Sequence, residues 1–431
     1  MMKIMVFKSF LVFMPLLLLS CSLEVKDVVK HDSLGFIPLS QSATTGSLPP
    51  CAPVALPEGY AQSILIQEWS QCSDARVTLD AVAEMSDRTD MNTMNETEAM
   101  PGRYLYRTHE TNEGRAAISV IDRETGQTAI HTGEAFGGWN SFDGIEWTPW
   151  GTLLAAEEAG AYGRLFECQA TGLHLTCQDR PAVGRMSHEG IAVASDGAVY
   201  VGDELDGGSI FKFVPENYGD LSSGQLFALN IINGGKTVCS GETGIGFTPT
   251  GAAEWVALTT GRNDVVTDPA TNARAAAKEA GVTRFCRPED AEIIDGNLYV
   301  ATTTTRTVFQ ISIMNERPFV TEYAGINTNI NNESDVPNYG LFSPDNLASD
   351  RAGNLYITED NAGKSDIWMA TPDKDQDGMA DSVVLFATLT TKGAEASGIY
   401  FPPSAPRIMF LNVQHAENRN DMTLMISPIH D

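Results

Sequence analysis

Apolar residues in this chain occur in short runs, and many of these runs begin or end at an acidic residue. In the stretch Trp139–Glu158, Asp143 opens a short apolar run, a turn follows at Pro149–Gly151, and a second apolar run ends at Glu157 and Glu158. Two such runs separated by a Pro/Gly turn predict an antiparallel hairpin. Because a hairpin returns the chain to the edge where it began, we expect Asp143 and the two glutamates to lie at the same end.

The same pattern recurs along the chain. Further copies begin near Glu189, Glu289, Asp345 and Glu395, a truncated copy ends at Glu110, and third strands follow at Ser209–Pro215, Val308–Ile313 and Asp366–Pro372. A unit of strands and Gly turns that repeats about every 50 residues indicates a β-propeller. We therefore predict an all-β fold, a six-bladed β-propeller. Seven blades stay open, because the interval between the Glu189 and Glu289 copies is double length and holds a candidate strand at 251–259.

The first strand of each propeller blade lines the central channel, so acids at the strand starts should meet at one mouth. The strand-start acids are Asp143, Glu189, Glu289 and Asp345, and the strand-end acids expected at the same mouth are Glu110, Glu157, Glu158, Asp203, Glu204, Glu359 and Asp360. Carboxylates this close repel one another or retain protons unless cations neutralise them. We interpret the set as a metal cluster with the ligands Asp143, Glu189, Glu289, Glu110, Glu158, Asp203, Glu204 and Asp345. The alternative for each acid is a solvated position in a turn.

The N-terminus has the features of an export signal. Residues 1–20 place Lys3 and Lys8 before an apolar run too short for a stop-transfer helix, and Leu18–Cys21 resembles a bacterial lipobox. We predict a lipoprotein signal peptide at 1–20, lipidation of Cys21, a polar tether at 21–50 and a single propeller domain at 51–431. The expected location is the cell envelope, at the outer membrane or in the periplasm of a Gram-negative host, with the lipid anchor as the contact with the membrane. A cleaved signal without lipid is the alternative.

The acidic composition narrows the range of partners. The chain has 28 Lys and Arg against 56 Asp and Glu, a formal net charge of −28. This charge argues against binding to nucleic acid or to anionic lipid, and it suits the binding of cations. We expect a monomer that does not bind nucleic acid.

Beyond Cys21 the chain has six cysteines, an even number that suggests disulfides in an exported protein. Closeness in sequence favours the pairs Cys51–Cys72 and Cys168–Cys177, which leaves Cys239–Cys286. Other pairings stay open. A metal site built from thiolates is the rival interpretation, but no CxxC spacing supports it.

Residues 373–381 place acids at alternate positions before a glycine. The acids are Asp373, Asp375 and Asp377, followed after Gly378 by Asp381. Oxygen ligands in a D-x-D-x-D-G arrangement are typical of calcium loops. The segment is shorter than an EF-hand loop and lacks its closing glutamate. It predicts a structural calcium ion on an exposed connection, with an acidic turn as the alternative.

Six motifs resemble, in order, those of the PhoX-type alkaline phosphatases. They are TPWGT with Glu157 and Glu158, GRMSHE at 184–189, YVGDE at 200–204, RPE at 287–289, SPDN at 343–346 and NVQH at 412–415. The resemblance implies a six-bladed propeller with an iron–calcium cluster in its channel, which hydrolyses phosphate monoesters outside the cytoplasm. It implies that Glu189 and Glu289 bind metal, that Arg287 binds the phosphate, and that Arg287 and Glu289 are catalytic residues.

One position departs from the family pattern. The family has an iron-binding cysteine five residues before the threonine of TPWGT, and this chain has Asp143 there. A carboxylate replaces a soft ligand with a hard one. We therefore expect several calcium ions, and iron is left open.

These features predict an exported metal-dependent phosphatase that acts on small organic phosphate esters. One alternative is a calcium-stabilised lipoprotein propeller that binds a ligand or partner without catalysis. Another is a calcium-dependent lactonase or esterase. Arg287 distinguishes the phosphatase from the lactonase, because a lactonase has no need of a phosphate-binding arginine.

Overall fold

In the computed structural model, the larger of two compact units spans Pro38–Asp431, and the described residues are 36–79, 88–97, 100–235, 237–239, 247–315, 317–325, 340–362 and 365–429. The predicted signal peptide and Cys21 lie outside these residues. The amide of Leu39 donates to the carbonyl of Leu385 at 3.0 Å, so the predicted tether from Pro38 onward belongs to the folded unit. Among the described residues, no helix is long and apolar enough to cross a membrane.

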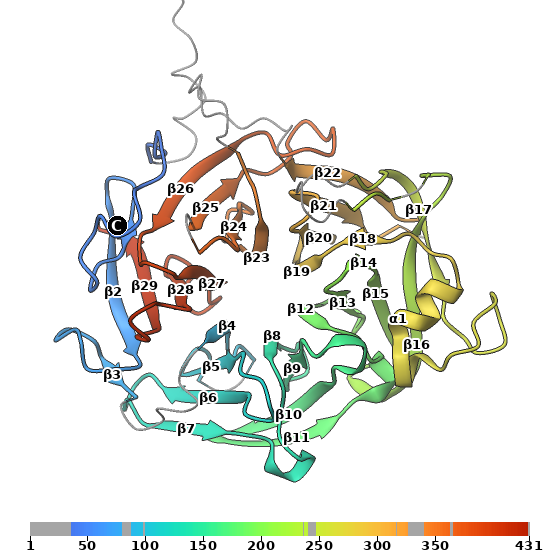
Figure 1. Cartoon of the computed structure of the whole chain (residues 1–431), viewed down its shortest axis with the longest axis horizontal. Coiled ribbons are helices and arrows are strands. Elements are labelled where there is room, and N and C mark those ends of the chain that lie inside the picture. Colours follow the sequence, from blue (N-terminus) through green and yellow to red (C-terminus); the bar gives the residue numbers. More distant parts are fainter. Residues whose placement is uncertain are drawn as a thin grey trace, which may run out of the picture. The chain divides into compact units, whose positions relative to one another are not determined.

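Most strands of this unit form antiparallel sets of four that run outward from a common centre (Figure 1). Three sets are β4 (Thr89–Met94), β5 (Tyr104–His109), β6 (Ala117–Asp122) and β7 (Thr128–His131); β8 (Phe142–Trp147), β9 (Leu153–Glu157), β10 (Leu165–Thr171) and β11 (His174–Asp179); and β12 (His188–Val193), β13 (Val199–Asp203), β15 (Ile210–Asn217) and β16 (Asp220–Ile231). The others are β19 (Pro288–Ile294), β20 (Asn297–Thr302), β21 (Thr307–Ser312) and β22 (Phe319–Gly325); β23 (Pro344–Ser349), β24 (Leu355–Glu359), β25 (Ser365–Ala370) and β26 (Val383–Leu389); and β27 (Glu395–Tyr400), β28 (Met409–Gln414) and β29 (Met422–Pro428) with β2 (Tyr60–Gln67). Because β2 pairs with β29, the last set joins the two ends of the folded chain.

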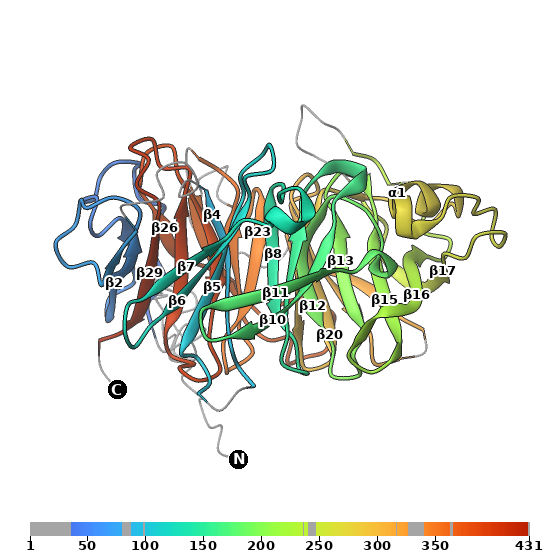
Figure 2. The ribbon, with the colours of Figure 1, turned by 90° about the horizontal axis from the view of Figure 1, so that it is seen from below.

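The innermost strands of these sets are β4, β8, β12, β19, β23 and β27, and they surround the centre (Figure 1). Their contacts close a circle: β4 touches β8 and β27, β12 touches β8 and β19, and β23 touches β19 and β27. Figure 2 shows the sets from the side, standing next to one another around the same centre, with the helix α1 (Pro269–Glu279) near one rim. The chain therefore repeats one structural unit around a common centre, as the sequence predicts.

The remaining elements connect or extend the sets. They are β1 (Val54–Ala55), β3 (Val77–Thr78), β14 (Asp206–Gly208), β17 (Gly251–Ala257), β18 (Phe285–Cys286), and the 3₁₀ helices η2 (Glu134–Phe136), η3 (Gly160–Tyr162) and η4 (Pro181–Val183). Strand β17 pairs with both β16 and β22. The candidate strand near 251–259 therefore extends the outer edges of two sets and does not open a set of its own.

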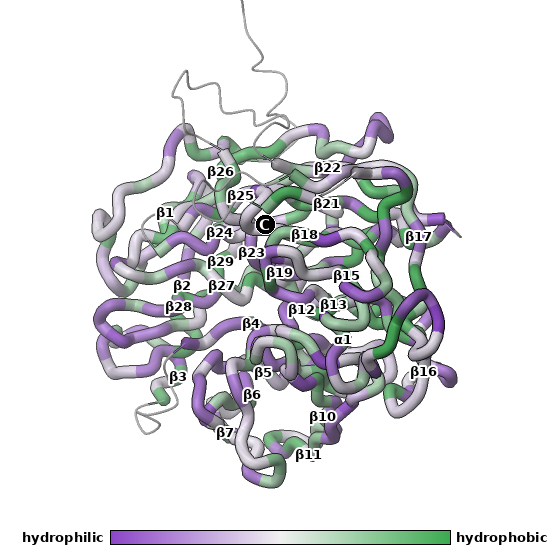
Figure 3. The backbone as a smooth tube through the Cα atoms, turned by 45° about the vertical axis from the view of Figure 1, so that its right-hand side comes forward, coloured by the Kyte–Doolittle hydropathy of each residue, from purple (hydrophilic) through white to green (hydrophobic). Residues whose placement is uncertain are grey.

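Apolar side chains pack between neighbouring sets. Tyr106 of β5 belongs to one cluster with Phe142 and Phe166, and Leu154 of β9 belongs to another with Phe211. Fully burying one large apolar side chain contributes about 1.5–3 kcal/mol. Figure 3 shows that hydrophilic residues also occur on innermost strands such as β4, whose sequence is TDMNTM. The sets thus pack together through apolar faces, and polar residues occur on the innermost strands.

The structure contains the three disulfides that proximity in the sequence predicts, Cys51–Cys72, Cys168–Cys177 and Cys239–Cys286. Cys168 and Cys177 lie opposite each other on β10 and β11. The Cys239–Cys286 bridge ties the segment after β16 to β18. The predicted pairing is confirmed.

Candidate functional site

Each innermost strand has an irregular register, which begins at the first residue in five strands and lies toward the end of the strand in β27. The shifts fall between Thr89 and Asn92, Phe142 and Ile145, His188 and Ile191, Pro288 and Ala291, Pro344 and Leu347, and Ser397 and Tyr400. Five of these segments contain an acid: Asp90, Asp143, Glu189, Glu289 and Asp345. A bulge bends the strand locally and changes the direction of its side chains. The acids therefore lie where the regular ladder is interrupted, and not within it.

Five acids form two overlapping groups of three, which we call the acid triads. One carboxylate oxygen each of Asp143, Glu158 and Glu189 lie within 4.8 Å of one another, and so do those of Glu189, Glu204 and Glu289. Glu189 belongs to both groups. Oδ1 of Asp143 is buried and has no hydrogen-bond partner among the described residues. The triads are compact enough for each to hold a cation through carboxylate oxygens.

Burial and mutual repulsion keep protons on the acid triads when no cation is present. Burial, and then the charges of neighbouring acids, raise the pKa of Asp143 and of Glu189 well above the usual range of carboxyl groups. The same causes, with a hydrogen bond to Glu204, raise the pKa of Glu158 to about 10. Burial raises the pKa of Glu289 to about 8, although the nearby Arg287 lowers it. The site therefore requires either protons or cations.

A second group of acids surrounds the triads. Its members are Asp90, Glu110, Asp345, Asp360 and Glu395. Burial raises the pKa of Glu110 to about 7, with the charge of Asp90 as the next cause. It also raises the pKa of Glu395 to about 7 and that of Asp345 well above its usual range. Acidic groups are thus concentrated around the whole mouth, and burial favours the protonated forms of Glu110, Glu395 and Asp345.

Arg287 brings a positive charge to these acids. Its Nε lies 2.8 Å from Oε1 of Glu204 and 3.2 Å from Oε1 of Glu289, and its Nη1 lies 3.7 Å from Oδ2 of Asp360. Burial opposes the charge of the guanidinium, but these three carboxylates outweigh that effect and raise the pKa of Arg287. Its backbone has a φ of 53° and is fixed by Leu205, whose carbonyl accepts from the Arg287 amide at 3.0 Å. The guanidinium is about one-third exposed, so it can meet a ligand from the mouth.

The three histidines near the predicted acids have different surroundings. His415 Nε2 lies 3.1 Å from Glu395 and 3.8 Å from Glu110; burial lowers the pKa of His415, but the bond to Glu395 and the nearby charges raise it to about 9. Nε2 of His109 bonds Ser119, and Nε2 of His188 bonds the carbonyl of Gly184. Only His415 of these three bonds the acids at the mouth.

Three of the predicted acids are held by other partners. Asp203 forms an ion pair with Arg274, with Nη2 and Oδ1 2.6 Å apart. Glu157 pairs with Arg164 at 2.6 Å, and Glu359 accepts from the indole of Trp368 at 3.0 Å. Of these, only Asp203 is among the predicted metal ligands, and the structure does not bring it into the triads.

The predicted ligand set omits Asp90, Asp360 and Glu395, which the structure places with the other acids. Asp90 lies in β4, where the sequence TDMNTM is polar and gives no apolar run to mark a strand. Its position in the chain still offers a signal, because it stands just before the strand at Tyr104–His109, as Asp143 stands before β9. Glu395 and Asp360 both occur in the recurring pattern of acids at strand starts and ends, and this position is the sequence signal for them.

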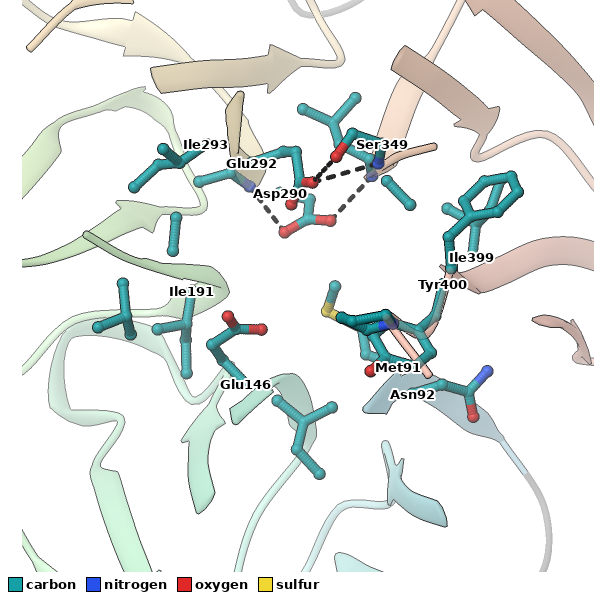
Figure 4. A pocket seen from close by; sticks show the side chains of 18 of the residues that line it. Met91, Asn92, Glu146, Ile191, Asp290, Glu292, Ile293, Ser349, Ile399 and Tyr400 are labelled. Carbon is teal, nitrogen blue, oxygen red and sulfur yellow. Dashed lines mark hydrogen bonds between the residues drawn. The ribbon is translucent and has the colours of Figure 1, made fainter. Parts of the chain in front are cut away.

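A cavity of about 450 Å³ lies along the same innermost strands, at positions later in each strand than the triads (Figure 4). Figure 4 shows Glu146 opposite Asp290 and Glu292. Asp290 accepts from the amide of Leu347 at 2.8 Å, and Glu292 accepts from the hydroxyl of Ser349 at 2.6 Å. These bonds tie β19 to β23. Asp290 and Glu292 thus help to hold two of the innermost strands together.

The predicted calcium loop is formed as a turn. Oxygens of Asp373, Asp375 and Asp381 lie within 4.8 Å of one another. Asp377 contributes differently, since its carboxylate accepts from the amide of Met379 at 2.9 Å. The loop brings three of the four predicted acids together.

Comparison with known proteins gives a match to one family model and a fold. Residues 143–335 match the family model of alkaline phosphatase PhoX, which confirms the predicted resemblance. No match was found among curated protein sequences. The crystal structure of Pseudomonas fluorescens PhoX in complex with vanadate, a transition state analogue, is 18% identical, with a TM-score of 0.65 over 91% of this chain and 97% of that chain.

Two other solved structures are more distant. A virginiamycin B lyase from Staphylococcus aureus is 12% identical, with a TM-score of 0.45 over 86% of this chain and 100% of that chain. A gluconolactonase from Xanthomonas campestris is 12% identical, with a TM-score of 0.44 over 91% of this chain and 96% of that chain. Identities this low concern the fold alone. The likeness to the Pseudomonas structure confirms a mostly-β fold of the propeller type.

Proposed function

We propose, on the premise that the chain is related to the PhoX-type alkaline phosphatases, that it is a metal-dependent phosphatase acting on small organic phosphate esters. The observation that carries the proposal is the position of Arg287, whose guanidinium contacts Glu204 and Glu289 of the acid triads. A phosphoryl group carries negative charge on several oxygens, and a guanidinium beside carboxylate-held cations can bind them together. A lactone offers no such group.

The donor set fits calcium. All five residues of the acid triads offer oxygen, the ligand that calcium prefers, and Oδ1 of Asp143 is buried without a partner among the described residues. The soft ligand that the family resemblance implies for iron is missing here. Asp143 stands in its place, and the cysteines of the described chain are joined in three disulfides. We therefore propose calcium as the cofactor and assign no role to a thiolate-bound iron.

The residues of the chain itself have distinct roles in this proposal. Asp143, Glu158, Glu189, Glu204 and Glu289 would hold the cations, and Arg287 would bind phosphoryl oxygens at the mouth. Bound cations supply Lewis-acid stabilisation of the charge on the phosphoryl group. Thr303 links the two residues, because its hydroxyl donates to the Glu289 carboxylate and its amide donates to the backbone carbonyl of Arg287 at 3.1 Å.

We also propose that the strand sets are the blades of a six-bladed propeller, because six innermost strands form one closed circle of contacts. The signal at residues 1–20 and the lipobox at Cys21 support export and a lipid anchor in the cell envelope, with the protein acting as a monomer. Cys21→Ser is expected to release the chain from the membrane fraction. A variant that stayed bound to membranes would contradict the lipid anchor.

A chromogenic phosphate monoester tests the proposed activity. The calcium-loaded parent should hydrolyse p-nitrophenyl phosphate, and both the chelated parent and Glu289→Gln should be strongly impaired, because each loses cations at the triads. A lactone and a carboxyl ester serve as counter-substrates. Turnover of these but not of the phosphate ester, or no turnover by a fully calcium-loaded parent, would contradict the proposal.

A further inference from the structure

We infer that Arg274 of helix α1 is a positioning residue for the acid triads, acting through the Asp203 carboxylate. The inference rests on the proposed function only in using the same cation site. It assigns a role to an ion pair outside the acid triads, and it concerns a helix that lies in the sequence between β17 and β18.

The Arg274–Asp203 contact is two-pronged and largely withdrawn from water. Nε of Arg274 donates to both oxygens of Asp203, at 2.8 and 3.1 Å, and Nη2 donates to Oδ1 at 2.6 Å. The side chain of Asp203 is 1% exposed and that of Arg274 is 23% exposed. Paired donors of this kind fix geometry as well as charge.

Asp203 in turn fixes the backbone that carries the triads. Its Oδ1 accepts from the amide of Ser187 at 3.1 Å, and the carbonyl of Ser187 accepts from the amide of Glu204 at 3.0 Å. Ser187 also forms an isolated bridge with Glu158. Glu189 follows two residues later. Three acids of the triads therefore depend on the backbone at Ser187, and Asp203 holds that backbone.

Helix α1 presents Arg274 from a fixed position. The amide of Ala273 donates to the carbonyl of Arg185 at 2.8 Å, and the amide of Arg185 donates to the carbonyl of Pro269 at 3.2 Å. The helix is interrupted at Asn272, where φ is −164° and ψ is 87°. Ala273 is buried among the apolar residues that also pack the neighbouring strand sets. The guanidinium is thus attached to a helix that is itself docked beside the segment leading into β12, the strand that carries Glu189.

Without Arg274, the carboxylate of Asp203 would stay buried but lose the guanidinium with which it forms an ion pair. A buried carboxylate without its ion-pair partner costs free energy, which favours movement of the side chain toward water. Such movement weakens its bond to the Ser187 amide and loosens the positions of Glu189 and Glu204. Loss of a group that orients metal ligands typically lowers metal affinity about 10–100-fold.

The test is the calcium affinity of Arg274→Met, measured by titration calorimetry with calcium alone. Its matched control is Arg180→Met, which breaks the ion pair with Glu167, a pair with a similar exposure of 19% and 6% and the same 2.8 Å contact from Nε. Both variants should lose stability. Only Arg274→Met should bind calcium about 10–100-fold more weakly. Arg274→Lys keeps the charge without the two-pronged contact and should lie between this variant and the parent.

Two outcomes would overturn the inference. The first is that Arg274→Met binds calcium with the same affinity as Arg180→Met, with Arg274→Lys taking its place if Arg274→Met does not fold. The second is that the parent binds no calcium. A parent that binds calcium but does not hydrolyse phosphate esters would contradict the proposed phosphatase and leave the positioning role intact. The two failures are therefore distinguishable.

Discussion

Removal of calcium from the purified protein is expected to lower its melting temperature by roughly 5 °C or more at pH 8, and by much less at pH 5. A cation that binds only the folded chain stabilises it by about 2.7 kcal/mol at a hundredfold excess over its dissociation constant. The two acid triads offer two such sites. At pH 5 the triad acids hold protons in place of cations, so less is lost when calcium is removed.

The direction of the pH dependence follows from the raised pKa values. Carboxyl groups of an unfolded chain have pKa values of about 4. In the fold without cations, the pKa is about 7 for Glu110 and Glu395, about 8 for Glu289 and about 10 for Glu158. Between those limits the folded chain binds more protons than the unfolded chain, so its stability falls as the pH rises. The contribution of the protonated acids is complete below about pH 4 and is lost as the pH passes through the raised values.

Thermal melts at pH 5 and pH 8, each with a calcium chelator and with excess calcium, check this expectation. The chelated protein should be less stable at pH 8 than at pH 5, and calcium should restore most of the difference. Asp375→Asn, which alters the predicted calcium loop but not the triads, should keep the same dependence on pH. A melting temperature at pH 8 that is the same with and without the chelator would contradict a cation site at the triads.

Arg287→Ala is expected to reduce kcat for a phosphate monoester by about 10²–10³-fold, because one preorganised donor to the transition-state charge is lost. The fold should change little. Alanine has a Cβ like arginine, so the substitution adds no strain at the φ of 53°, and cations at the triads would still neutralise Glu204 and Glu289. Arg287→Lys should recover part of the rate, since it restores the charge but not the planar pair of donors.

Arg306→Ala is the matched control. Arg306 also has a positive φ, of 57°, and its guanidinium lies 4.8 Å from the centre of the Phe342 ring. Its kcat should stay within a few-fold of the parent's. If Arg287→Ala retained the parent's kcat and changed only KM, Arg287 would bind substrate without stabilising the transition state.

The repeated hairpin was the part of the fold that the sequence could predict, because each copy carries its own signal. An acid, an apolar run, a Gly turn and a second apolar run recur around Asp143, Glu189, Glu289 and Asp345, and each pattern depends on neighbouring residues. The sequence pattern does not predict strand β4, because TDMNTM has no alternation of apolar and polar residues. The candidate strand at 251–259 exists as β17. Its partners, β16 and β22, belong to two different strand sets, and the local sequence does not indicate this pairing.

The sequence could predict only those acids of the candidate site whose place follows from the start or end of a strand. Glu189 and Glu289 at strand starts come together with Glu158 and Glu204 at strand ends, as the hairpin pattern predicts. Asp203 follows the same sequence pattern as Glu204 but bonds Arg274 instead, a residue 71 positions away on a helix that the strand pattern does not reveal. A partner that distant leaves no local signal, so sequence alone assigned Asp203 to the ligands.

Equilibrium dialysis against calcium, followed by elemental analysis, tests the central claim most directly. The parent should retain at least two calcium ions that Glu189→Gln loses or binds far more weakly, because Glu189 is shared by both triads. Asp375→Asn should keep those two ions, since its loop is separate. A parent without tightly held calcium, or a Glu189→Gln variant with the same calcium content as the parent, would contradict the claim that these carboxylates form a cation site.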